Sequence, residues 1–224
     1  MGAKDWMIMY ADTDTDIAGV LRDHPPIDRA ATRAVVERLH PGTSLIPFQD
    51  GTLADQSNPE DGTVYAGVYP GLTVLLTEEA AQERPSQLPQ RFLDEAQGRT
   101  VYLHAMHSVV GWFAYAVWEN GVLRRSLSLS PDDGILENLG EPLPFEQPYW
   151  AGERADEDDA DWAEFTKFVV VERPVAVKEQ PFDFNPLELG EDALSALFGF
   201  VYEGTPPDDA PDLERITLAG YRLS

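Results

Sequence analysis

Two histidines, His104 and His107, are the side chains of this chain best suited to metal or proton chemistry. Imidazole ligates divalent metals and exchanges protons near neutral pH. Both lie in the segment YLHAMHSVV, which has the composition of a strand, and an odd separation on a strand sends two side chains to opposite faces. They meet only if His107 lies beyond the end of that strand. The pattern therefore favours packed or hydrogen-bonded histidines; the alternative is a metal-dependent hydrolase that uses both with nearby carboxylates.

Three carboxylates at alternate positions, Asp12, Asp14 and Asp16, form a second candidate, because carboxylate oxygens are the ligands that hard cations prefer. The segment does not match a calcium-binding loop, since Ile17 stands where the sharp turn needs glycine. It also resembles the first motif of aspartate-nucleophile phosphatases, with Thr77 as a candidate second motif. Asp16 departs from that motif, which has Thr or Val at this position, and no later acidic motif follows to hold magnesium. The sequence therefore favours a solvated loop or a weak cation site.

Arg125 is the third candidate, because alternation along its predicted strand places it on an apolar face. A buried guanidinium needs a carboxylate partner, since an unpaired buried charge is strongly destabilising. Glu137, Glu141 and Asp132, in the segment SPDDGILENLGE, are the candidate partners. We expect a structural ion pair, with an anion-binding or catalytic site as the alternative. The chain contains no GxSxG, P-loop, GxGxxG or HExxH motif.

A β-hairpin over residues 111–130 is the element that positions these groups. Two strand-forming runs flank Asn120 and Gly121, which both tolerate the positive φ of a two-residue type I′ turn. The predicted register sets residue 119 opposite 122 and residue 118 opposite 123, and so on outward. We expect the core face to carry Trp112, Ala114, Ala116, Trp118, Leu123, Arg125, Leu127 and Leu129, and the other face Phe113, Tyr115, Val117, Arg124, Ser126 and Ser128. A small-molecule site around Trp112, Trp118 and Arg125 is a further alternative.

The remaining pattern predicts one α+β domain over residues 1–224, with a mostly antiparallel sheet and about three helices. We expect the acidic run at 153–162 to be a solvated surface loop. The predicted helices are 25–40, 87–97 and 190–202. The predicted strands outside the hairpin are 5–11, 43–48, 62–69, 72–77, 100–106, 165–171 and an edge strand at 216–223.

The charge and composition restrict the function classes. The formal net charge is −24, from 40 acidic and 16 basic residues, which disfavours direct binding to nucleic acid. Acidic surfaces of this kind commonly serve solubility, and the alternative is a docking surface for a basic protein partner. The chain has no Cys, which excludes disulfides, thiol catalysis and thiolate metal sites. No apolar run approaches the roughly 20 residues that a membrane helix needs, and the amino terminus lacks a signal-peptide pattern. We expect a cytoplasmic protein with no membrane association and no cofactor.

Several blocks along the chain resemble an uncharacterised protein family found in actinobacteria. They are MGAKDWMIMYAD, DGTVYAGVYPG, RPSQLPQRF, RTVYLHAMHSVVGWFAYAVWENGVLRRSLSLSPDDGILENLGEPLPFE and PLELGEDALSALFGF. The resemblance spans nearly the whole chain and implies a bacterial, cytoplasmic, single-domain protein. It implies no activity. The leading hypothesis is therefore a non-enzymatic acidic binding protein; the alternative is the metal-dependent hydrolase that uses His104 and His107.

Overall fold

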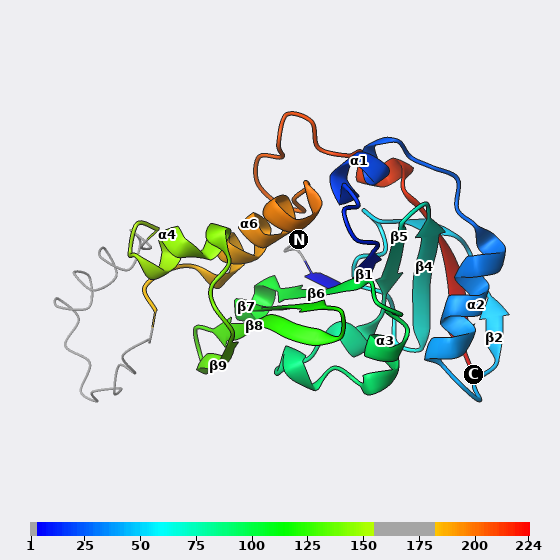
Figure 1. Cartoon of the computed structure of the whole chain (residues 1–224), viewed down its shortest axis with the longest axis horizontal. Coiled ribbons are helices and arrows are strands. Elements are labelled where there is room, and N and C mark those ends of the chain that lie inside the picture. Colours follow the sequence, from blue (N-terminus) through cyan, green and yellow to red (C-terminus); the bar gives the residue numbers. More distant parts are fainter. Residues whose placement is uncertain (1–3, 155–181) are drawn as a thin grey trace.

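A single ten-stranded sheet organises the protein (Figure 1). The computed structural model describes residues 4–154 and 182–224. In this part of the chain the strand order is β2-β10-β4-β5-β1-β6-β7-β8-β9, β3 pairs with β10, and every pairing is antiparallel. The strands are β1 (Lys4–Ala11), β2 (Leu45–Pro47), β3 (Gly51–Thr52), β4 (Thr63–Tyr69), β5 (Leu72–Leu76), β6 (Thr100–His107), β7 (Trp112–Glu119), β8 (Val122–Ser130), β9 (Gly134–Leu139) and β10 (Thr217–Leu223).

Five α-helices lie in the described residues, where about three were expected. The additional ones, of six and four residues, are too short to show a helical period. The α-helices are α1 (Ile17–Arg22), α2 (Arg29–Leu39), α3 (Gln90–Asp94), α4 (Gln147–Trp150) and α6 (Pro186–Phe198), and the 3-10 helices are η1 (Glu78–Ala80), η2 (Pro85–Gln87), η3 (Ser108–Val110), η4 (Pro144–Glu146) and η5 (Leu213–Arg215). The predicted α+β class with a mostly antiparallel sheet is confirmed.

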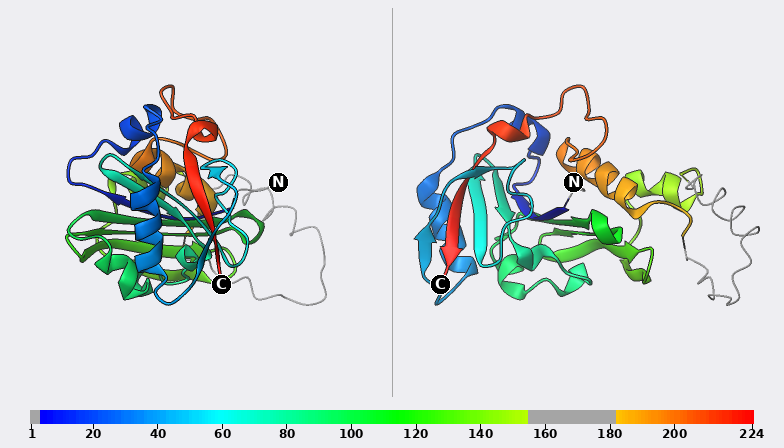
Figure 2. Two further views of the ribbon diagram at one scale, coloured as in Figure 1. Left: turned by 90° about the vertical axis from the view of Figure 1, so that its right-hand side faces the viewer. Right: turned by 180° about the vertical axis from the view of Figure 1, so that it is seen from behind.

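The sheet is buried on both faces, which explains why residues 6–11 of β1 are all apolar or aromatic. Ile8 and Tyr10 pack on one face, with Val36 of α2 and Phe92 of α3. We call this the α2 face. Met7 and Met9 pack on the opposite face with residues of α1 and α6, and we call it the α6 face. In Figures 1 and 2, α4 and α6 cover the β6–β9 half of the α6 face, while α3 lies on the other side.

The β7–β8 pairing differs from the predicted hairpin register after its second pair. Asn120 and Gly121 have φ values of 50° and 75°, and the pairs 119 with 122 and 118 with 123 are present. A bulge then makes Val117 pair with Arg125, so that Arg124 is the extra residue. One inserted residue moves every later side chain to the other face. The predicted placement of Arg125, Leu127 and Leu129 beside the tryptophans is therefore wrong, and these three lie on the α6 face beside Phe113, Tyr115 and Val117.

Three other predictions need correction. The last strand, β10, is not an edge strand, because it lies between β2 and β4. The α6 helix begins four residues earlier than expected, where Asn185 caps Leu187 N with Pro186 in the first turn, and it ends at Gly199 with a φ of 78°. Residues 134–139 form edge strand β9 where a loop was expected. The predicted strand at 165–171 and most of the acidic run at 153–162 lie outside the described residues.

The α6 helix approaches the sheet closely at Gly190. A Cβ at this position would lie 2.9 Å from Met106 Sδ and 3.1 Å from Phe113 Cδ2. Both neighbours are buried, so the approach depends on the absence of a side chain.

We predict that Gly190→Ala lowers the free energy of unfolding by about 1–3 kcal/mol, because the new methyl overpacks the interface. Helix propensity alone would give the opposite sign, a gain of about 1 kcal/mol. The control is Ala196→Gly on the exposed side of α6, which should lose about 1 kcal/mol from propensity. Urea denaturation measures both; a more stable Gly190→Ala protein would contradict the close-packing argument.

Candidate functional site

His104 is fully buried and joins β6 to β1 and α6. Its Nδ1 lies 2.7 Å from Asp5 Oδ2, and its Nε2 lies 3.0 Å from the Gly190 carbonyl oxygen. A carboxylate and a carbonyl only accept, so both ring nitrogens donate and the ring is an imidazolium. Burial alone would lower the pKa of His104, but Asp5 and the Gly190 carbonyl outweigh it and raise that pKa above its ordinary value. Both nitrogens are thus committed to structure.

His107 does not meet His104. It is the last residue of β6 and not a residue beyond it, so its side chain lies on the α2 face, where its ring is 6.0 Å from that of Trp6. Burial and the nearby Lys4 lower the pKa of His107. Within residues 4–154 and 182–224, no three His, Asp or Glu side chains are arranged to hold a metal ion. The structure therefore separates the two histidines of the predicted hydrolase site.

The three aspartates after β1 form a turn and a helix cap. Asp16 Oδ1 accepts from Gly19 N at 2.9 Å, which caps α1, and its Oδ2 lies 3.4 Å from Arg22. Asp12 and Asp14 are exposed, and Asp14 has a φ of 66°. The capping role of Asp16 was available in the sequence, because an acidic residue directly precedes the short helix.

Arg125 forms a buried ion pair with Glu146 and not with any of its predicted partners. Arg125 Nε lies 2.8 Å from Glu146 Oε1, and Arg125 Nη2 lies 2.5 Å from Glu146 Oε2. Both residues are fully buried. Nη1 of Arg125 also donates to Asn138 Oδ1 at 2.6 Å and to the carbonyls of Leu139 and Gly140, each at 3.1 Å. The guanidinium is thus satisfied within the protein.

The carboxylate of Glu146 is equally satisfied. It accepts from Leu143 N at 2.7 Å, from Trp150 Nε1 at 3.0 Å and from the Tyr115 hydroxyl. Burial raises the pKa of Glu146, but the hydrogen bonds from Arg125, Trp150 and Tyr115 outweigh it and hold that pKa below its ordinary value. This arrangement is a structural centre that ties η4 and α4 to the sheet.

The predicted partners of Arg125 lie elsewhere. Glu137 accepts from Ser86 N at 2.9 Å, from Ser86 Oγ at 2.7 Å and from Ser126 Oγ, so it connects η2 to the sheet. Glu141 and Asp132 are exposed. The sequence did not indicate Glu146 as the partner, because the bulge changes the face on which Arg125 lies. Glu146 also lies 21 residues from Arg125 along the chain, in a Pro-rich segment.

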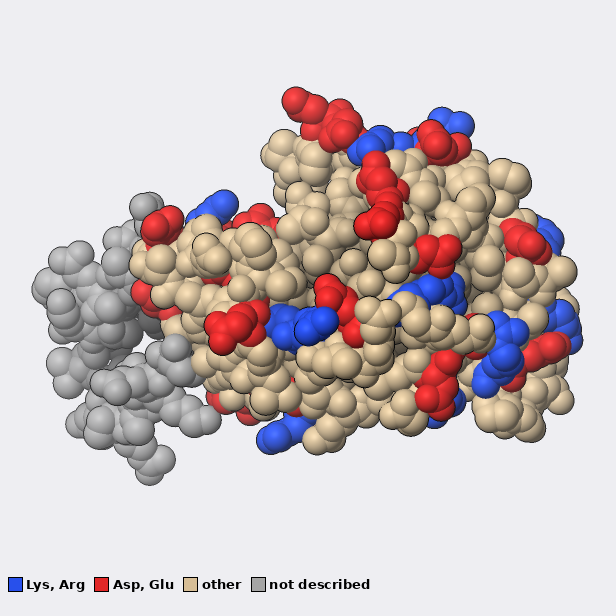
Figure 3. All heavy atoms as spheres, viewed as in Figure 1, with Lys and Arg blue, Asp and Glu red and all other residues tan. Residues whose placement is uncertain are grey.

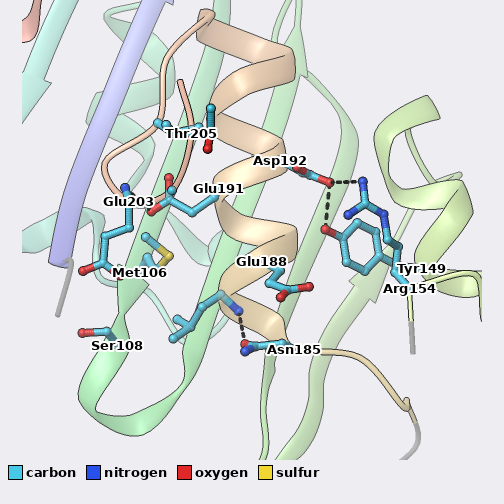
Figure 4. Close-up of a pocket in the computed structure, with 13 residues that line it drawn as sticks. Met106, Ser108, Tyr149, Arg154, Asn185, Glu188, Glu191, Asp192, Glu203 and Thr205 are labelled. Atoms are coloured by element: carbon cyan, nitrogen blue, oxygen red, sulfur yellow. Dashed lines mark hydrogen bonds and ion pairs between the residues drawn. The ribbon is translucent and has the colours of Figure 1, made fainter. Parts of the chain in front are cut away.

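A pocket of about 400 Å³ lies along α6, and four carboxyl side chains line it (Figure 4). Glu188, Glu191 and Asp192 reach it from α6, and Glu203 comes from the following loop. Arg154 is the one cationic residue in the lining formed by residues 4–154 and 182–224, and it lies 3.6 Å from Asp192. We call this cavity the α6 pocket. Its lining residues are Met106, Ser108, Tyr149, Arg154, Asn185, Leu187, Glu188, Glu191, Asp192, Val201, Glu203, Gly204 and Thr205.

The carboxylates reach the pocket from the two flanks of one face of α6. Figure 4 shows Tyr149 and Arg154 meeting Asp192 on one side, with the Tyr149 hydroxyl 2.8 Å from Asp192 Oδ2. On the other side, Glu191 and Glu203 lie near Met106. Arg154 pairs with Asp192, whereas Glu188 lies on the same side of the pocket without contributing to that ion pair.

Glu191 anchors the loop that follows α6. Its two oxygens accept from Tyr202 N at 2.8 Å and from Glu203 N at 3.0 Å. Burial raises the pKa of Glu191 to about 7, although these two hydrogen bonds and the His104 imidazolium lower it. The carboxylate is therefore poised to exchange a proton near neutral pH.

The α6 pocket was not predicted from the sequence. The available signal was the spacing of Glu188, Glu191 and Asp192, which places three carboxylates on one side of a helix. The pocket also needs the ends of β6 and α4 and the loop at 201–205, which only the fold brings together.

These features define an acidic α+β protein with a carboxylate-lined pocket. The chain belongs to a family of unknown function (DUF6928), whose model matches residues 5–221. No curated protein and no solved structure matches the chain. Among the described helices, none has the length and apolar character needed to cross a membrane.

We predict that Arg125→Met lowers the free energy of unfolding by about 3–5 kcal/mol, because it leaves Glu146 buried without its cation. Arg124→Met is the matched control: it removes the same charge from the neighbouring exposed residue, which pairs with Glu119 at the surface, and should cost less than about 1 kcal/mol. Chemical denaturation of the two variants measures the difference. Equal losses would show that the buried pair has no special role.

The raised pKa of Glu191 predicts a pH-dependent stability. A carboxyl whose folded pKa lies above its ordinary 4.5 stabilises the fold fully below that value, and the stabilisation is lost as the pH rises through about 7. His104 acts in the same direction, because its folded pKa is also raised above its ordinary value.

Glu191→Gln loses one of the two backbone hydrogen bonds at every pH, because its amide nitrogen cannot accept. Its unfolding free energy relative to the parent protein should therefore rise by on the order of 1–3 kcal/mol from the acidic end of this range to above pH 7.5. Glu188→Gln, one turn earlier in α6 and exposed, should show no such pH-dependent gain. Thermal melts across the pH range give the comparison. A gain that is constant with pH would refute the assignment to Glu191.

Proposed function

We propose that this protein is a non-enzymatic binding protein whose α6 pocket receives a Lys or Arg side chain of a basic protein partner. The observation that supports this most directly is the lining of the pocket, where the described residues include four carboxyl groups and a single arginine, which is already paired with Asp192. A cation entering the pocket would meet a negative potential in a partly desolvated site, where charge interactions are stronger than at an open surface.

The polar lining suits a hydrogen-bonding cation. Ser108 Oγ is buried and has no hydrogen-bond partner among the described residues, and such a group is stabilised by a ligand that supplies one. Met106, Leu187 and Val201 provide apolar surface for the aliphatic stem of a Lys or Arg. Hence the pocket offers contacts to both parts of such a side chain.

The charge of the whole chain supports the same class of partner. The net charge is −24, and Figure 3 shows acidic side chains spread over the visible face, with most basic ones beside them. A field of this sign accelerates encounter with a basic protein and repels nucleic acid.

The metal-dependent hydrolase that uses His104 and His107 gains no support from the geometry. One histidine is saturated by Asp5 and Gly190, and the other lies on the opposite face of the sheet. On the sequence blocks that resemble an actinobacterial family, we also propose a cytoplasmic protein of actinobacteria.

The test is fluorescence anisotropy of a labelled Lys- and Arg-rich peptide at low salt. We expect binding that the double variant Glu188→Gln, Glu203→Gln weakens by about tenfold or more, since each lost contact with a cation changes affinity measurably. Asp61→Asn with Glu214→Gln is the matched control, because both are exposed acidic residues outside the pocket, and should change affinity less than about threefold. Equal weakening by the two double variants, or no binding to the parent protein, would contradict the proposal.

A further inference from the structure

A second pocket, of about 340 Å³, lies on the α2 face at the end of β6 and β7. Its apolar part is formed by Trp112, Val110 and Leu136, and its carboxylates are Glu83, Asp132 and Asp133. We call it the Trp112 pocket. It shares no lining residue with the α6 pocket, and the function proposed above does not use it.

Two contacts fix the position of Trp112, the aromatic side chain that lines this pocket. Trp112 Nε1 donates to Ser128 Oγ at 3.1 Å, and its ring lies 5.9 Å from that of Trp6. Trp6 in turn contacts the ring of His107, which also lines the pocket. A half-buried indole with a fixed position presents a preformed aromatic surface to a ligand.

The rim of the pocket is apolar as well as acidic. Val110, which lines the pocket, is 50% exposed, and its neighbour Val109 in η3, outside the lining, is 77% exposed. Among the described residues, no Lys or Arg belongs to the lining of the pocket, and Lys4 lies close enough to His107 to lower its pKa. The lining itself carries three carboxylates.

His107 contributes an unused polar atom. Its Nδ1 is buried and has no hydrogen-bond partner among the described residues. Burial and Lys4 lower the pKa of His107, so the ring is neutral at pH 7 and does not repel a cation. A neutral imidazole nitrogen can accept a hydrogen bond from an ammonium group.

We propose that the Trp112 pocket binds an organic cation with an apolar body, such as an arylalkyl ammonium, its apolar part against Trp112 and its ammonium among Glu83, Asp132 and Asp133. Two interactions of different kinds support this class of ligand. The apolar body of the ligand buries its surface against the indole of Trp112, and the carboxylates give a charge complementary to the ammonium. The same carboxylates would repel an anion.

Isothermal titration calorimetry at pH 7 with 2-phenylethylammonium tests the proposal. We expect saturable binding, and at least about tenfold weaker binding of the neutral 2-phenylethanol, which has the same apolar body without the charge. Methylammonium, which carries the charge without the body, should also bind at least about tenfold more weakly. Equal binding of the alcohol, or no binding of the amine, would overturn the proposal.

Two double variants locate the site. Glu83→Gln with Asp133→Asn should weaken the amine by about tenfold or more, while Glu188→Gln with Glu203→Gln, which removes the same charge from the α6 pocket, should leave it within about twofold. Equal weakening by both would show a response to net charge alone and would overturn the assignment. Trp112→Leu should also weaken binding, and Trp112→Phe should retain most of it. A thermal melt checks that Trp112→Leu is folded. An unchanged affinity in the folded Trp112→Leu protein would contradict the aromatic contact.

Discussion

The imidazolium of His104 links three elements that are far apart in the sequence: the central strand β1 through Asp5, its own strand β6, and α6 through the Gly190 carbonyl. A neutral ring could not donate to both partners, so the contact depends on a buried charge and on the carboxylate that balances it. The missing side chain at Gly190 lets α6 come near enough for this contact. Because α6 carries three of the four carboxylates of the α6 pocket, the pocket depends on this docking.

The Arg125–Glu146 pair performs the corresponding task at the other end of the helical layer. It fixes η4 and α4 against β8, and α4 supplies Tyr149, whose hydroxyl donates to Asp192 on α6. Two buried ion pairs therefore position opposite sides of one pocket. Buried pairs of this kind give little net stability, since desolvation offsets their attraction, but removing one partner is costly. Their value here is in specifying where the helices lie.

Much of the fold followed from patterns that are local in the sequence. The strands predicted at 5–11, 62–69 and 72–77 and the Asn-Gly turn before β8 lie close to the positions observed. The hairpin faces could not be derived beyond Trp118 and Leu123, because the bulge at Arg124 depends on packing and not on turn chemistry. Because of this one extra residue, Arg125 lies on the face opposite to the predicted one, and its partner there is Glu146. The α6 pocket was out of reach for a similar reason, since its lining comes from distant segments that only the sheet order brings together.

Side-chain alternation at the end of β6 has one more consequence. Met106 and Ser108 line the α6 pocket, while His107, between them, lines the Trp112 pocket. Three successive residues therefore form part of the wall of two pockets on opposite sides of one backbone. A ligand that shifts this backbone on entering one pocket changes the free energy of binding at the other. Thermodynamic linkage then requires the effect to be mutual, with each ligand altering the affinity for the other by the same factor.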